Sequence, residues 1–167
     1  MSKLLIDNGT KFKANCENTC NRMNLNVKFT MTLESYLNKL TEYGCIGAGQ
    51  GMKSMECSVG FCELIDSIIP REGKISLNVA MEFINGVAPV EHLLLTRTDL
   101  WGFHNRISKS DEVLRSVIRV VLCCLYYPEN KYDQLDGLIN AMEFCCIADK
   151  TLKDEDFLRV AKGVYLV

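Results

Sequence analysis

The clearest pattern in the chain is a strict alternation of apolar and polar side chains over residues 74–83. Its apolar members are Ile75, Leu77, Val79, Met81 and Phe83. A period of two is typical of a strand with one buried and one solvent-facing side. The Asn85-Gly86 dipeptide that follows fits a two-residue type I′ turn, in which both positions need positive φ. We therefore predict a hairpin whose return strand, residues 87–94, lies at a sheet edge because Pro89 cannot donate a ladder hydrogen bond.

A second alternating segment, residues 25–33, predicts an earlier strand, and a short terminal strand is expected over residues 164–167. Apolar side chains three and four positions apart predict helices over residues 35–43, 58–69, 113–127, 132–148 and 154–162. The segment 113–127 is also β-branched enough for a strand, but its length favours a buried helix. Together these elements predict an α+β fold, with a small antiparallel sheet, helices packed on one of its faces and a helical C-terminal third.

The length of 167 residues suits one domain. Residues 1–23, rich in Asn, Lys and Thr, are expected to form a flexible arm, and residues 24–167 a single globular domain. Hydrophobic residues make up 48% and charged residues 24% of the chain, which argues against disorder. There is no apolar run of about 18 residues to span a membrane, and polar residues interrupt the start too early for a secretory signal. We expect a soluble, intracellular protein.

Nine cysteines are present, an odd number, and most lie in apolar stretches such as the one around Cys123-Cys124. Such cysteines are typical of buried free thiols in a reducing compartment. Cys16 and Cys20 have the spacing of half a zinc site, which His92 or His104 would complete, but no second cysteine pair supports it. We therefore expect no metal ion and no cofactor.

Candidate catalytic groups are few. The predicted hairpin register places His92 in the core beside Val79. His104 lies in the aromatic segment 101–106, which fits a binding loop but is more often a packed corner. A cysteine and a histidine that meet in space could still form a nucleophile pair, so a small cysteine enzyme stays open as an alternative. The glycines of residues 47–51 have neither dinucleotide-binding nor P-loop spacing and are interpreted as a connector.

Charge is unevenly distributed, although the net charge is only −2. Residues 1–30 carry five basic and two acidic side chains, a net charge of +3, whereas residues 129–156 carry three basic and eight acidic ones, a net charge of −5. A basic arm and an acidic region on one molecule suit head-to-tail association or contact with anionic surfaces, although an ordinary solvated surface is the simpler and more common explanation of such charges.

The predicted order of strand, short helix, glycine-bearing loop, helix and strand over residues 24–83 resembles the core of rhabdovirus matrix proteins. The segment Val27-Lys28-Phe29-Thr30-Met31-Thr32-Leu33-Glu34-Ser35 is similar to the first core strand of that family. The resemblance covers the first half of the chain, and the length and small net charge fit plant-infecting, cytorhabdovirus-like members. The chain lacks the proline-rich budding motif and the dense N-terminal lysine cluster of the family.

The resemblance implies a non-enzymatic structural protein of the virion and host cytoplasm. Such a protein would self-associate through its arm, condense a nucleocapsid of nucleoprotein and RNA, and lie against an anionic membrane surface. The side chains that would contact phosphates or a neighbouring copy are Lys3, Lys11, Lys13 and Arg22.

A second hypothesis is an interaction module, such as a helical groove binder of the Bcl-2 type, built on the helices at residues 111–127 and 132–148. The two alternating segments and the Asn-Gly turn count against it, because an all-helical fold has no use for them.

Overall fold

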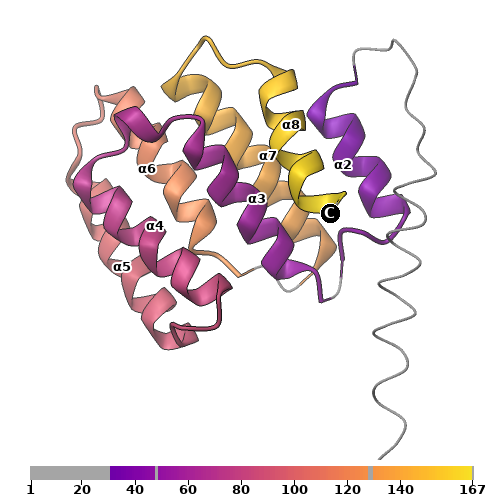
Figure 1. The fold of residues 1–167 in the computed structure, drawn as a ribbon. Coiled ribbons are helices and arrows are strands. Elements are labelled where there is room, and N and C mark those ends of the chain that lie inside the picture. The colour runs from indigo at the N-terminus through magenta and orange to yellow at the C-terminus, as the bar shows by residue number, and fades with distance from the viewer. Residues whose placement is uncertain (1–30, 48, 128–129, 167) are drawn as a thin grey trace, which may run out of the picture.

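The computed structural model describes residues 31–47, 49–127 and 130–166, and within these ranges the chain forms helices and no strand (Figure 1). The α-helices are α2 (Leu33–Glu42), α3 (Gly51–Glu63), α4 (Arg71–Ile84), α5 (Val90–Arg106), α6 (Glu112–Cys124), α7 (Lys131–Ala148) and α8 (Asp154–Tyr165). A 3₁₀ turn, Asp66–Ile68, connects α3 to α4. The predicted α+β fold is therefore wrong, and the protein is all-helical over the described residues.

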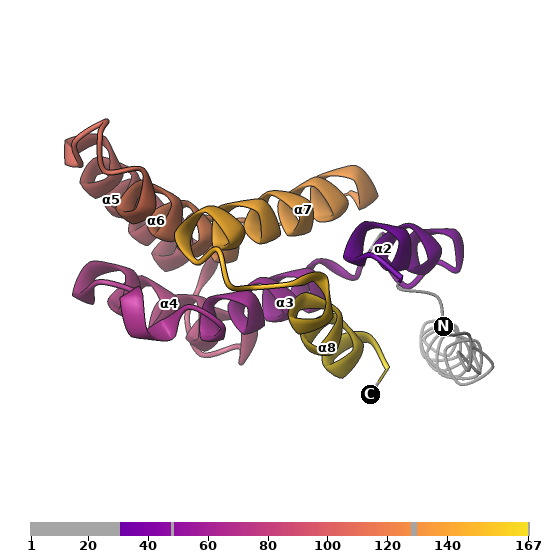
Figure 2. The same cartoon turned by 90° about the horizontal axis from the view of Figure 1, so that it is seen from above.

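The helices form two layers, which Figure 2 shows from above. Helices α4, α3 and α8 make one layer, and α5, α6 and α7 make the other. Helix α3 contacts α6 and α7 across the layers, and α4 packs on α5. Helix α2 covers one end, where it contacts α7 and α8. Its buried side chains, Leu33, Tyr36, Leu37 and Leu40, recur at helical spacing and join the common core.

Helix α3 is the central element of the molecule. It contacts α4, α6, α7 and α8, and of its thirteen residues only Glu56 and Glu63 are exposed. Phe61 is fully buried and packs edge-on against Phe157 of α8, with ring centroids 5.1 Å apart. Gly60 faces Val160 so closely that an added Cβ would lie 2.5 Å from its Cγ1 atom. The lack of a side chain at Gly60 thus allows α8 to pack close to α3.

The segment predicted as the clearest strand is helix α4. The residues that face the core are Gly73, Ser76, Val79 and Ala80, which recur at helical spacing. Of the alternating apolar residues, Ile75 and Met81 are about half exposed. The alternation gave a wrong prediction because the buried side of α4 consists mostly of small residues. These residues allow close helix packing, but a search for large apolar side chains does not detect them.

The Asn85-Gly86 dipeptide ends α4 and does not form a hairpin turn. Asn85 has φ −80° and is the C-cap, whereas Gly86 has φ +72°. The Gly86 amide donates to the carbonyl of Phe83 at 2.9 Å, and the Val87 amide to that of Glu82 at 2.8 Å. This pair of hydrogen bonds is the Schellman motif, which needs one left-handed residue where a type I′ turn needs two.

The predicted return strand belongs to helix α5. Pro89 is its N-cap, a position at which the missing amide proton removes no helical hydrogen bond. His92, predicted in the core beside Val79, is exposed in the first turn of this helix. The register that placed His92 inside disappears with the hairpin.

The remaining helix predictions are largely confirmed. The segments around 35–43, 113–127 and 132–148 form α2, α6 and α7. Gly44, with φ +73°, ends α2 as expected. Ser58 does not begin a helix: it lies within α3, where its hydroxyl donates to the Ser54 carbonyl at 3.1 Å. Helix α8 continues through Gly163 to Tyr165, so the expected terminal strand is wrong over the described residues.

Several predictions concern residues outside the described ranges. These are the arm over residues 1–23, the strand residues 25–30, the cysteine pair Cys16 and Cys20, and the basic residues Lys3, Lys11, Lys13 and Arg22. The element order that suggested the matrix proteins is not observed over residues 31–83, because the second strand is α4. The matrix-like function itself stays a prediction.

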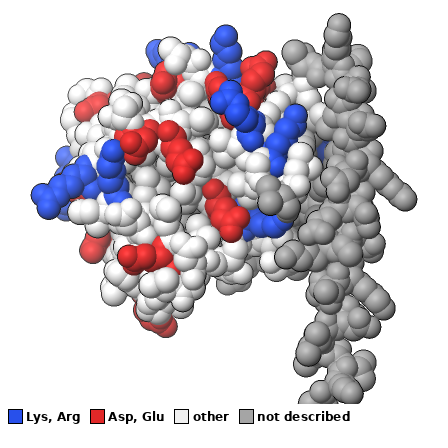
Figure 3. Space-filling model, viewed as in Figure 1, with Lys and Arg blue, Asp and Glu red and all other residues white. Residues whose placement is uncertain are grey.

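The surface in Figure 3 shows acidic and basic side chains in small, interspersed groups, with neither sign dominating that face. Among the described residues, none of the helices is both long enough and apolar enough to cross a bilayer.

Candidate functional site

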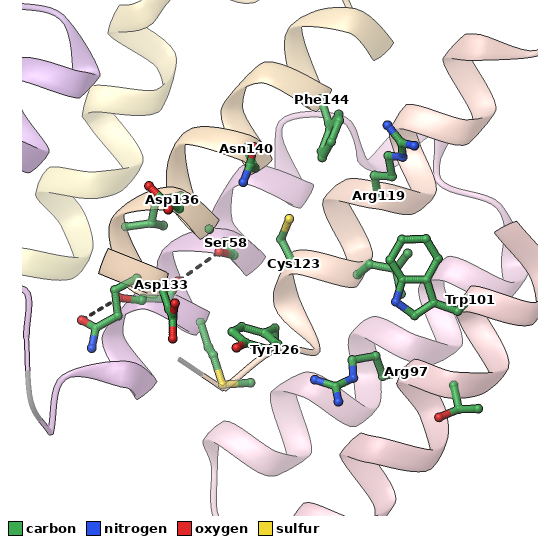
Figure 4. A pocket seen from close by; sticks show the side chains of 17 residues that line it. Ser58, Arg97, Trp101, Arg119, Cys123, Tyr126, Asp133, Asp136, Asn140 and Phe144 are labelled. Carbon is green, nitrogen blue, oxygen red and sulfur yellow. Dashed lines mark hydrogen bonds between the residues drawn. The ribbon is translucent and has the colours of Figure 1, made fainter. Parts of the chain in front are cut away.

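A groove of about 800 Å³ opens between α5 and α7, and we call it the α5–α7 groove (Figure 4). Side chains of α5 and α7 form its two walls, and α6 and α3 contribute its floor. Met55 and Leu122 of the floor, and Leu138 of α7, are buried members of the core, and the buried Ser54 and Ser58 lie in the floor helix α3. The deepest part of the groove is therefore mostly apolar, while charged, polar and aromatic groups line its sides.

The α5 wall presents Arg97, Thr98 and Trp101. Trp101 lies about one turn after the other two, so the three side chains share a helix face. Leu94 lies one turn before them on the same face. Leu94 and Trp101 are each 43% exposed, and Tyr126, after the end of α6, is 46% exposed. Large aromatic and apolar side chains thus remain in contact with water along this edge of the groove.

Two arginines are held against aromatic rings of the groove. The Cζ atom of Arg97 lies 5.5 Å from the ring centroid of Tyr126, and that of Arg119 lies 5.2 Å from the centroid of Phe144. Such cation–π contacts fix the direction of a guanidinium but leave its N–H donors unused. Within the described part of the chain, neither arginine forms an ion pair.

The α7 wall presents Asp133, Asp136, Asn140 and Phe144, with Gly137 near their centre. In Figure 4 the two aspartates lie across the groove from Arg97 and Trp101, with α6 between them. An added Cβ at Gly137 would have no neighbouring atom within 4 Å. The middle of this wall is therefore open space.

Buried polar contacts fix α7 beside this groove. The Gln134 side chain donates to the Gly47 carbonyl at 2.7 Å and accepts from the Gly47 amide at 3.1 Å. The Ser54 hydroxyl donates to the side-chain oxygen of Gln134 at 3.3 Å and lies 3.1 Å from the Tyr165 hydroxyl. These contacts join α3, α7, α8 and the α2–α3 connector. Gly47, predicted to lie in a simple connector, is thus bound to α7 through both of its backbone polar groups.

Four of the thiols in the described part of the chain are poor nucleophiles because they are buried. Burial raises the pKa of Cys123, the thiol that lines the groove, to about 12, with a further contribution from Cys124. Burial also raises the pKa of Cys57, Cys62 and Cys145. The Sγ atoms of Cys62 and Cys124 lie 3.4 Å apart without a covalent bond. At neutral pH the reactive thiolate is therefore scarce at these positions.

His104 is buried in the last turn of α5, where a packed corner was expected. Its ring packs edge-on against Trp101 at 5.1 Å, and its Nε2 atom has no hydrogen-bond partner. Burial lowers its pKa, and the nearby Arg115 and Arg119 lower it further, while the hydrogen bond to Asn105 opposes them. Among the described residues, neither histidine is hydrogen-bonded to a cysteine.

The structure contains no group of three or more potential metal ligands among the described residues. The sequence did not predict the α5–α7 groove. Arg97 and Trp101 were visible as a basic residue and part of an aromatic connector, but their four-residue spacing defines a common face only if the segment is helical. Because residues 87–94 were predicted to form a strand, the shared helix face of Arg97 and Trp101 was not inferred.

Comparison with family models, with curated proteins and with solved structures gives no significant match.

Proposed function

We propose that the protein is a non-enzymatic interaction module that binds an amphipathic helix of another protein in the α5–α7 groove, in the manner of a helical groove binder of the Bcl-2 type. The observation that carries the proposal is the pair of large exposed side chains Trp101 and Tyr126, which line the groove beside the buried apolar residues Met55, Leu122 and Leu138. Tryptophan, tyrosine and arginine are the residues that most often dominate binding energy at protein interfaces.

The dimensions of the groove suit a helix. Asp133 and Phe144 are eleven residues apart on α7, so this wall is about 16 Å long, or three helical turns. A partner helix with apolar side chains at i, i+3, i+4 and i+7 would place them on the floor. The raised pKa of the buried thiols, and the lack of a histidine–cysteine hydrogen bond among the described residues, favour binding over catalysis.

The test uses a display library of 21-residue amphipathic helices, selected for binding to the full chain. Selected peptides are then measured against Gly137→Phe, which places a ring in the open middle of the α7 wall. Because replacing a helical glycine improves helix propensity, this variant is expected to fold. We expect it to lose at least tenfold in affinity by isothermal calorimetry.

Gly163→Phe is the matched control, since Gly163 also lies in a helix with no atom near an added Cβ but is outside the α5–α7 groove. It should leave affinity unchanged. Equal affinities for both variants, or a library that yields no helical binder, would overturn the proposal. So would a dimer of the unliganded chain that Gly137→Phe dissociates, because the occupant would then be a second copy.

A further inference from the structure

Charges of both signs line the α5–α7 groove (Figure 4). Arg97 belongs to the α5 wall, Arg119 belongs to the floor helix α6 and rests on Phe144 of α7, and Asp133 and Asp136 belong to the α7 wall. None of the four forms an ion pair within the described part of the chain. Asp133 accepts one hydrogen bond, from the Asn130 side chain at 2.6 Å, but Asp136 has no such partner in that part of the chain.

Within the described part of the chain, these charges are not neutralised by one another. The aromatic rings of Tyr126 and Phe144 hold the guanidinium groups of Arg97 and Arg119, and cation–π contact does not neutralise a charge. The guanidinium donors match carboxylates, and a lysine amine suits an aspartate. Charges of opposite sign on the two sides of the groove therefore favour a ligand whose two edges carry the complementary charges.

Resting on the proposed function, we infer that the partner helix is bipolar: one edge of its apolar stripe is acidic and meets Arg97 and Arg119, and the other is basic and meets Asp133 and Asp136. The same charges fix the direction in which the helix lies, because reversing the helix would exchange its two edges and place like charges together. A helix acidic on both edges gains at one wall and loses at the other.

The experiment uses three synthetic 21-residue peptides with one shared leucine–isoleucine stripe. The edges carry glutamate on one side and lysine on the other, glutamate on both sides, or glutamine on both sides. We expect the bipolar peptide to bind the full chain about tenfold more tightly than the neutral one, with no gain for the doubly acidic one. The advantage should disappear near 1 M salt, where screening acts over about 3 Å.

Asp136→Lys reverses one charge of the α7 wall. It should weaken the bipolar peptide and strengthen the doubly acidic one, each about fivefold, while the neutral peptide binds as before. Glu82→Lys is the control: it makes the same charge change at an exposed position of α4 that does not line the groove, and it should leave the ranking unchanged.

Equal binding of all three peptides to the wild-type chain would overturn the inference, as would an effect of Asp136→Lys no different from that of Glu82→Lys. If in that case Gly137→Phe still abolished binding, the proposed helix-binding function would stand without the charge rule. If none of the peptides bound, the proposed function would fail, and the inference with it.

Discussion

At the scale of single residues, His104 connects the interior to the groove. Its ring is almost fully buried and packs against Trp101, which forms part of the α5 wall. Arg115 and Arg119 of α6 lie close enough to disfavour a positive charge on it. Protonation of the His104 ring would place a positive charge in a buried position between α5 and α6. The Nε2 atom has no hydrogen-bond acceptor there, and the two arginines repel the charge.

The stability of the protein should fall as the pH is lowered through the region of the usual histidine pKa of 6.5. The pKa of His104 is lowered in the folded state. As the pH falls, the unfolded chain therefore binds a proton at this histidine at a higher pH than the folded protein does, and this proton uptake favours the unfolded state. One such group contributes at most about 1.4 kcal/mol per pH unit. Urea unfolding at pH 7, 6 and 5 should give a shallower pH dependence for His104→Gln than for the wild type.

The other histidine supplies the control for this measurement. His92→Gln removes the other histidine, at an exposed position of the same helix, and is the variant with which His104→Gln is compared. Parallel curves for the wild type and His104→Gln would show that His104 titrates alike in both states.

At the scale of helices, small residues decide how closely α3 and its neighbours approach. Gly60→Ala would place a methyl group 2.5 Å from Val160, so α8 must shift or Val160 must change rotamer. We expect a loss of about 1–3 kcal/mol in unfolding free energy, as is usual for an overpacked core. Thermal and urea unfolding would measure it.

Gly163→Ala is the comparison within the same helix pair. Its added methyl group meets no atom within 4 Å, so it should be neutral or stabilise by up to about 1 kcal/mol through helix propensity. If both alanine variants had the same stability, the close approach at Gly60 would not be limiting.

Element type was predictable where helical spacing was carried by large apolar side chains. Helices α6 and α7 bury residues such as Val117, Val121 and Leu138, whose spacing is visible in the sequence. Helix α4 was not predictable in this way, because Ser76 and Ala80 face inward while Ile75 faces water. The burial of small residues is set by the neighbouring helices, which a local pattern does not contain.

At the scale of the whole molecule, one core connects both layers. Each of the described α-helices contributes buried apolar residues to a single cluster, which includes Leu33 of α2 and Tyr165 of α8. The error over α4 and α5 changed the fold class, since the hairpin was the main evidence for a sheet. The helical groove-binder hypothesis had placed its site on two helices, which form the floor and one wall, but it lacked the α5 wall.

A single core predicts a single unfolding transition. Trp101, the only tryptophan of the chain, reports on α5 by fluorescence, whereas far-UV circular dichroism reports on all helices. The two urea curves should coincide within error. The dichroism of the folded protein should be helical, and a strand fraction above about a tenth, or a fluorescence transition well ahead of the helical one, would contradict this structure.

Polar side chains of the two walls are held by different kinds of contact. The amide of Gln134 fastens α7 to Gly47 through two hydrogen bonds, as a peptide group would in a ladder, whereas Arg97 rests on Tyr126 through a ring face. Ring contacts tolerate sliding, but paired hydrogen bonds do not. A partner side chain that presses on Arg97 can therefore move its guanidinium along the Tyr126 ring, whereas one that presses on α7 meets a helix that these two hydrogen bonds hold in place.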